Sequence, residues 1–189
     1  MKYDLNKKQT IATKRTLSSL VKAMFTLLKT KSFESITVQE LCSLSLIPRA
    51  TFYNYFEDKY DLLDYCWFTL KENLDPGIND SNNCLNLLKT FLEKCIDYFD
   101  SNIESVNLIL KHNNLSHYLV SSFRLYLTNT ILSQINSYIS NFLVPNEIAA
   151  KHCADTVITL LEWKYVNKNN CSSDELIGYL EILLSKIYA

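Results

Sequence analysis

Glycine and proline are scarce in this chain, which has only 2 glycines and 3 prolines among 189 residues. All-β and α/β folds of this length need many more turn residues, because each reversal of a strand requires them. Helices joined by short connections need few. The scarcity therefore favours an all-α fold, and the length suits one domain or two small ones with a buried core.

Signals of secretion, membrane insertion and catalysis are also missing. The N-terminus is polar and charged, without the apolar region of a signal peptide, and no run reaches the ~18 apolar residues of a membrane helix. We find no glycine-rich phosphate loop, nucleophile motif or paired carboxylates. We therefore expect a cytoplasmic protein that is not an enzyme, binds no membrane and needs no cofactor.

The six cysteines lack the spacing of a metal site, since no pair forms C-x-x-C and none lies beside a histidine in a zinc-like pattern. Most lie among apolar residues, so we expect small buried side chains in a reducing compartment and no metal. The alternative is a redox sensor, for which Cys171, in a polar stretch, is the residue to test.

Basic residues are concentrated at the N-terminus. Residues 1–31 hold eight Lys or Arg and one acid, which gives +7, whereas the rest of the chain carries −8. A basic end on an acidic body suggests that this end meets a polyanion. The alternative is a solvated, lysine-rich helix face.

Apolar residues recur at helical spacing in about nine segments. The predicted helices span 10–31, 37–44, 48–56, 58–73, 83–99, 101–112, 116–142, 146–166 and 174–187. Asp75, Pro76 and Gly77 interrupt the pattern and predict a boundary between domains 1–75 and 76–189. The first domain would hold a three-helix unit with a helix-turn-helix.

The second and third predicted helices form the helix-turn-helix. Thr37 and Glu40 predict a capping box, and Pro48 opens the following helix after a short turn. We expect Leu44, Phe52 and Phe56 to face the core, with Val38, Leu41 and Cys42. The side chains left facing outward are then Arg49, Tyr53, Asn54 and Tyr55. They would add little to core packing, and their chemistry suits contacts with phosphates and bases. The alternative for each tyrosine is a rim aromatic with a wet hydroxyl.

The run T-V-Q-E-L-C, followed by I-P-R-A-T-F-Y-N-Y-F-E-D-K-Y-D-L-L, resembles the DNA-binding domain of the TetR/AcrR family of bacterial regulators. The resemblance covers residues 10 to about 70, and its patterned positions are Thr37, Leu41, Cys42, Ile47, Thr51, Phe52, Tyr53, Tyr55, Phe56, Lys59 and Leu62. The chain departs from the pattern at three positions. Leu46 replaces the turn glycine, Pro48 the capping serine, and Ala50 a second glycine.

The resemblance implies a dimeric regulator that binds a double-stranded DNA operator. Its DNA-binding residues would be Lys14, Arg15, Thr37, Pro48, Arg49, Ala50, Thr51, Tyr53, Asn54, Tyr55 and Lys59. Arg49 would read a guanine edge, and Ala50 and Thr51 would touch thymine methyls or phosphate. The others would contact the phosphate backbone and set the register.

The resemblance also implies roles for the C-terminal half. The last two helices, about 146–166 and 174–187, would pair with those of a second subunit, with Trp163 as an anchor. A small apolar or aromatic effector would bind among Phe91, Cys95, Tyr98, His117, Phe123, Tyr126 and Trp163, although such aromatic stripes are also typical of a core. The expected function is a repressor released from a palindromic operator by this effector. The alternative is a co-activator or regulator controlled by a protein partner.

Overall fold

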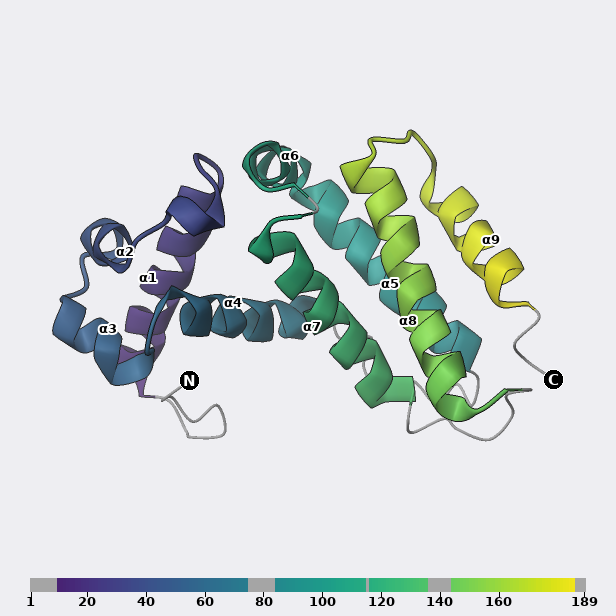
Figure 1. The fold of residues 1–189 in the computed structure, drawn as a ribbon, viewed down its shortest axis with the longest axis horizontal. Coiled ribbons are helices and arrows are strands. Elements are labelled where there is room, and N and C mark those ends of the chain that lie inside the picture. The colour runs from purple at the N-terminus through teal and green to yellow at the C-terminus, as the bar shows by residue number, and fades with distance from the viewer. Residues whose placement is uncertain (1–9, 75–83, 115, 136–143, 186–189) are drawn as a thin grey trace. The chain divides into compact units, whose positions relative to one another are not determined.

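The computed structural model describes residues 10–74, 84–114, 116–135 and 144–185, without the side chains of 71–73 and 135 (Figure 1). Within these ranges every regular element is helical, so the predicted all-α fold is confirmed. The elements are α1 (Ile11–Leu28), η1 (Phe33–Ser35, a 3-10 turn), α2 (Val38–Ser45), α3 (Arg49–Tyr55), α4 (Lys59–Leu74), α5 (Cys84–Ser101), α6 (Ile103–His112), α7 (Tyr118–Ile135), α8 (Asn146–Leu161), η2 (Glu162–Val166, a π turn) and α9 (Ser173–Leu184). None of the described helices has the length and apolar character needed to cross a bilayer.

The chain folds into two compact units and passes between them more than once. The first unit holds residues 1–72 and 104–119, and the second holds 73–103 and 120–189. The boundary expected from the sequence placed 104–119 with the second half, whereas the contacts place this stretch in the first unit. The predicted break at 75–77 lies outside the described residues.

Thr10 caps the start of helix α1, since its hydroxyl accepts the N–H of Thr13 at 3.2 Å. Its apolar stripe is buried as the periodicity predicts, and the side chains of Leu17, Leu20, Met24 and Leu28 are at most 1% exposed. Helix α2 packs on α1, and α3 packs on α2. The basic helix therefore forms the support of the helix-turn-helix.

Helix α2 begins with the predicted capping box, in which Thr37 and Glu40 cap one another. One expectation for this helix was wrong, because Leu44 is 48% exposed and not part of the core. Leu44 lies two residues after the buried Cys42, about 200° around the helix, so it points away from α1. Asp58 caps α4, since its Oδ1 accepts the N–H groups of Tyr60 and Asp61 at 2.8 and 3.0 Å.

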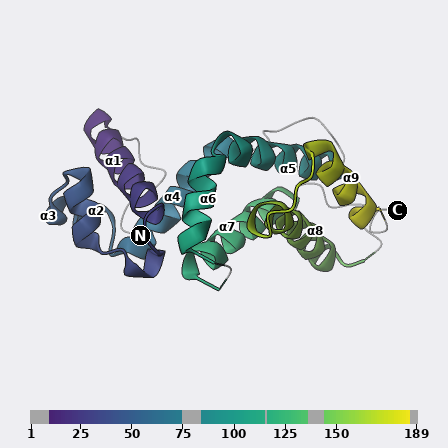
Figure 2. The ribbon, with the colours of Figure 1, turned by 90° about the horizontal axis from the view of Figure 1, so that it is seen from above.

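In the second unit, α5, α8 and α9 pack against one another (Figure 2). Leucines on one face of α9 are buried against this core: Leu176, Leu180 and Leu184. The predicted helix 146–166 is interrupted, because α8 ends at Leu161 and the chain continues as the π turn. This turn directs the hydroxyl of Tyr165 to Asp100 Oδ1, to which it donates at 2.8 Å. Residues 136–142 of the predicted helix 116–142 lie outside the described part of the chain.

Candidate nucleic-acid interface

Helix α3 separates its residues into a buried face and an exposed face. Phe52 and Phe56 are fully buried, and their ring centroids lie 5.6 Å apart. The exposed positions of the same short stretch are Pro48, Arg49, Ala50, Tyr53 and Asn54, with Thr51 and Tyr55 half-buried. The two phenylalanines therefore fix α3 to the unit and leave a polar and aromatic surface facing outward.

Arg49 and Tyr53, one helical turn apart, form a pair on this surface. Arg49 Nη2 donates to the hydroxyl oxygen of Tyr53 at 3.4 Å, and the guanidinium carbon lies 5.9 Å from the tyrosine ring centroid. A guanidinium held over an aromatic ring keeps its planar set of donors in a restricted orientation. The pair therefore presents Arg49 beside the start of α3.

The turn between α2 and α3 has a left-handed residue at Leu46, with φ 56° and ψ 32°. The N–H of Ile47 donates to the carbonyl of Cys42 at 3.0 Å, and the N–H of Leu46 reaches that of Ser43 at 3.4 Å. This is the Schellman pattern that ends many helices, and it normally places a glycine at the left-handed position. Pro48 is the N-cap of α3 rather than its first helical residue, and it supplies no side-chain cap.

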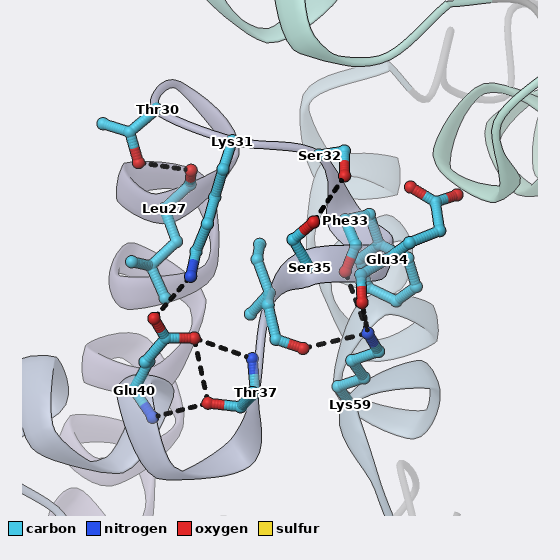
Figure 3. Close-up of polar contacts among 11 residues, drawn as sticks. Leu27, Thr30, Lys31, Ser32, Phe33, Glu34, Ser35, Thr37, Glu40 and Lys59 are labelled. Carbon is cyan, nitrogen blue, oxygen red and sulfur yellow. Dashed lines mark hydrogen bonds and ion pairs between the residues drawn. The ribbon is translucent and has the colours of Figure 1, made fainter.

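Thr37, expected to face a phosphate, is engaged by Glu40 (Figure 3). Its N–H and its hydroxyl both donate to Glu40 Oε2, at 3.0 and 2.9 Å, and its oxygen accepts the Glu40 N–H at 3.3 Å. Lys31 forms an ion pair with the other carboxylate oxygen. These contacts lower the pKa of Glu40 to about 2, and the hydrogen bond from Lys31 has the largest effect. A phosphate at this helix start would have to compete with a firmly ionised carboxylate.

Lys59, also expected to contact DNA, is directed into the first unit (Figure 3). Its Nζ donates to the carbonyl oxygens of Phe33 at 2.9 Å, Glu34 at 2.7 Å and Ile36 at 2.9 Å. An ammonium has three N–H groups, so this set uses them all. Burial lowers the pKa of Lys59, and the ring of Phe33 lies 4.8 Å from Nζ. In this arrangement Lys59 holds the connection between α1 and α2 in place.

Lys14 and Arg15 lie in the first turns of α1 and are exposed, away from its buried stripe. Their cationic groups are available to an approaching polyanion. Sequence reasoning missed Asn113, whose side chain is buried and accepts the N–H of Phe33 at 2.9 Å. No local pattern points to this contact, because the two residues are 80 positions apart.

The residues expected to line an effector pocket fall in both units, with His117 in the first and the other six in the second. Phe91 and Cys95 are buried in α5, and Trp163 packs edge-on against Tyr179 of α9 with ring centroids 6.0 Å apart. His117 belongs to the first unit, where its Nδ1 lies 4.0 Å from Glu34 Oε2. The other three expected residues are Tyr98, Phe123 and Tyr126, all in the second unit. The ring of Tyr98 contacts that of Phe99, and the rings of Phe123 and Tyr126 stack.

A polar groove of about 520 Å³ lies between α7 and α8 in the second unit. Its lining residues are Ser121, Arg124, Leu125, Thr128, Lys151, Asp155, Ile158 and Thr159. None of these is among the expected pocket residues. Arg124 and Lys151 are each paired with a carboxylate, Glu162 and Asp155 respectively, so the groove is close to neutral.

The same arrangement of helices occurs in solved structures. A TetR transcriptional regulator from Streptococcus agalactiae superposes with a TM-score of 0.63 at 21% identity, covering 90% of this chain and 94% of that one. The chain has the fold of the TetR family. NalD of Pseudomonas aeruginosa, the secondary repressor of a multidrug efflux pump, shares this TetR-like fold with a TM-score of 0.62 at 12% identity, covering 93% of this chain and 98% of that one.

A relative is also found by sequence. The Tn10 TetC protein of Escherichia coli is 25% identical over 146 residues, which cover 72% of this chain and 70% of that protein. No family model matches the chain. The resemblance to the TetR family inferred from the helix-turn-helix residues is thus confirmed for the fold.

Proposed function

We propose that the protein is a DNA-binding transcriptional regulator whose α3 enters the major groove of an operator. The observation that carries the proposal is the exposure of Arg49, Tyr53 and Asn54 on a helix fixed from behind by two buried phenylalanines. Residues 41–56 contain no acidic residue, and residues 1–31 carry +7. Both features favour a polyanionic partner.

The contacts divide into base reading and backbone positioning. Arg49 reads a guanine edge, and Ala50 and Thr51 touch neighbouring bases or phosphate. The backbone contacts come from Lys14, Arg15, Pro48, Tyr53, Asn54 and Tyr55. Thr37 is not among them, because its N–H and its hydroxyl already donate to Glu40. Lys59 acts indirectly, because its hydrogen bonds hold the α1–α2 connection on which α2 depends.

The protein acts as a homodimer through α8 and α9, which places two recognition helices about 34 Å apart on a palindrome. The outer face of α9 supports this, because Ile182 is 71% and Leu183 52% exposed. Gly178 lies on the same helix, and a Cβ built there meets no atom within 4 Å. Ile182 lies one turn after Gly178, and an apolar side chain beside a small residue suits close packing by a second helix.

Binding of the homodimer represses transcription, and a small aromatic effector releases it. Repression is the activity stated for NalD, which has the same fold. The aromatic residues of the second unit, among them Phe99, Phe123 and Tyr165, supply the kind of side chains that line sites for aromatic ligands. The effector acts by binding one conformation more tightly than the other.

The test is selection of duplexes from a random pool by the full-length protein. We expect enrichment of a palindrome whose half-sites are about one helical turn apart, and an affinity that falls linearly with log salt concentration. Uniform binding to all duplexes, or none, would contradict the proposal. Titration of the complex with small aromatic compounds then tests release. If only a co-purifying protein releases the DNA, control by a protein partner is favoured over control by a small effector.

A further inference from the structure

Leu46 occupies a backbone conformation that favours glycine. The Schellman pattern at the end of α2 requires a left-handed residue between Ser45 and Ile47, and Leu46 adopts φ 56° to complete it. A β-carbon in this conformation crowds the following carbonyl, so leucine is strained where glycine is not. Backbone strain of this kind is concentrated at functional sites, where the strained residue takes part in binding or catalysis.

Packing within the folded chain does not account for the strain at Leu46. The side chain of Leu46 is 88% exposed, so it adds almost nothing to the core. Leu44, also exposed, lies on the last turn of α2, so two exposed leucines occur five and three residues before Arg49. The combination of an exposed apolar side chain and a strained backbone at one residue points to a functional contact outside the folded chain.

The surroundings of Leu46 favour DNA as that partner. No acidic residue occurs between Leu41 and Phe56, and Arg49 is held beside the start of α3 by Tyr53. When the first residues of a recognition helix reach base edges, the turn before it lies at the rim of the major groove. The apolar group exposed at that rim is the 5-methyl group of thymine.

We propose that Leu46 is a DNA contact that packs against a thymine methyl beside the base pair read by Arg49. This inference rests on the proposed DNA-binding function and adds a specificity residue to it. Leu46 thereby favours A·T pairs at the outer edge of each half-site. Its strained conformation is the result of placing an apolar side chain at a turn position suited to glycine.

The test combines a protein change with a DNA change on the selected operator. Leu46→Gly should lower affinity by roughly four- to tenfold, and replacing the contacted thymine by deoxyuridine should lower wild-type affinity by roughly fourfold. With Leu46→Gly, the deoxyuridine change should have no further effect, because the two changes remove the same contact. Leu46→Met, which keeps an apolar side chain, should bind within about twofold of wild type.

Lys168→Gly is the matched control, because Lys168 is the other described non-glycine residue with positive φ, 57°, and lies in the second unit. Both glycine variants should raise the melting temperature by about 2–4 °C, but only Leu46→Gly should weaken DNA binding. A Leu46→Gly protein that binds as well as wild type, or no effect of deoxyuridine at any position, overturns the inference alone. If the Leu46→Gly protein binds DNA as well as wild type, the two exposed leucines are instead assigned to a contact with a protein partner. A wild-type protein that binds no duplex overturns the proposed function and this inference with it.

Discussion

The backbone N–H of Phe33 donates a 2.9 Å hydrogen bond to the side-chain oxygen of Asn113, 80 residues further along the chain. Both residues are fully buried, and the amide nitrogen of Asn113 donates to the carbonyl of Ile109 at 3.0 Å. One side chain thus connects the 3-10 turn after α1 to the end of α6. Close by, the N–H of Tyr118 donates to Glu34 Oε1 at 2.9 Å, and the rings of Phe33 and Tyr118 stack.

Replacing Asn113 by alanine should lower the free energy of unfolding by about 2 kcal/mol, because the buried N–H of Phe33 loses its acceptor. Urea denaturation measures the change. Asn102→Ala is the control, since the Asn102 side chain makes one exposed hydrogen bond, to the carbonyl of Tyr98, and its loss should cost less than about 0.5 kcal/mol. Equal effects of the two changes would show that the contact between Asn113 and Phe33 does not stabilise the fold.

Lys59→Met and Lys14→Met should separate a structural lysine from a DNA-binding one. Lys59→Met should cost about 2 kcal/mol of stability, because three carbonyl groups lose a charged donor. Lys14→Met should leave stability within about 0.5 kcal/mol and reduce the slope of log affinity against log salt by about 1. A stable Lys59→Met protein with a reduced salt slope would instead make Lys59 a phosphate contact.

The capping box of α2 should make stability depend on pH in the acid range. The pKa of Glu40 is lowered to about 2, so its stabilising contribution is complete above the ordinary value of 4.5 and disappears as the pH falls to about 2. Glu40→Gln should flatten this part of the curve of unfolding free energy against pH. The matched change is Glu175→Gln in the capping box of α9, where Ser172 lowers the pKa of Glu175 without a lysine. Its effect should be smaller, and equal effects would contradict a role for Lys31.

Arg49→Ala should relax base preference at one position of each half-site, at a cost of about 1–3 kcal/mol for the preferred duplex. The loss should be confined to that base pair, because a bidentate contact reads one guanine. Affinities for a set of operators changed at single positions measure it. Lys14→Met should weaken binding to all of these duplexes alike, and a uniform loss with Arg49→Ala would place Arg49 on the phosphate backbone.

Gly178→Leu should break the proposed homodimer while leaving each subunit folded. A Cβ added at Gly178 meets no atom within 4 Å, and leucine stabilises a helix relative to glycine by up to about 1 kcal/mol. Sedimentation measurements should show a shift toward monomer, with unchanged helical content by circular dichroism. Asn107→Leu, on the exposed surface of α6, is the control of similar size. A Gly178→Leu dimer as tight as the wild-type dimer would exclude this face from the interface.

The helix-turn-helix was largely predictable because its determinants are local. The capping box spans four residues, and the inward direction of Phe52 and Phe56 follows from their i,i+4 spacing. The sequence also identified Leu46 as a departure at a turn that needs glycine. The structure shows how the chain resolves it, by adopting the left-handed conformation despite the side chain.

The contacts that could not be predicted join distant residues. The pattern around Lys59 matched that of a DNA-binding lysine, and its carbonyl partners lie 23 to 26 residues earlier. The assignment of 104–119 to the second half followed chain order, whereas Asn113 and Tyr118 place this stretch in the first unit. Helical periodicity carries no information about such pairings, because it records only which face of a helix is apolar.

The first unit is built from two separate stretches of the chain, so it cannot be transferred to another protein as one continuous segment. A graft of its first 72 residues onto another protein of this fold would leave the Phe33 N–H without its acceptor and the Phe33 and Tyr60 rings without Tyr118. A working chimera would therefore need to inherit residues 104–119 as well. The unit that carries the proposed DNA-binding surface is therefore discontinuous in sequence, and substitutions in α6 should accompany those in η1 as proteins with this arrangement diverge.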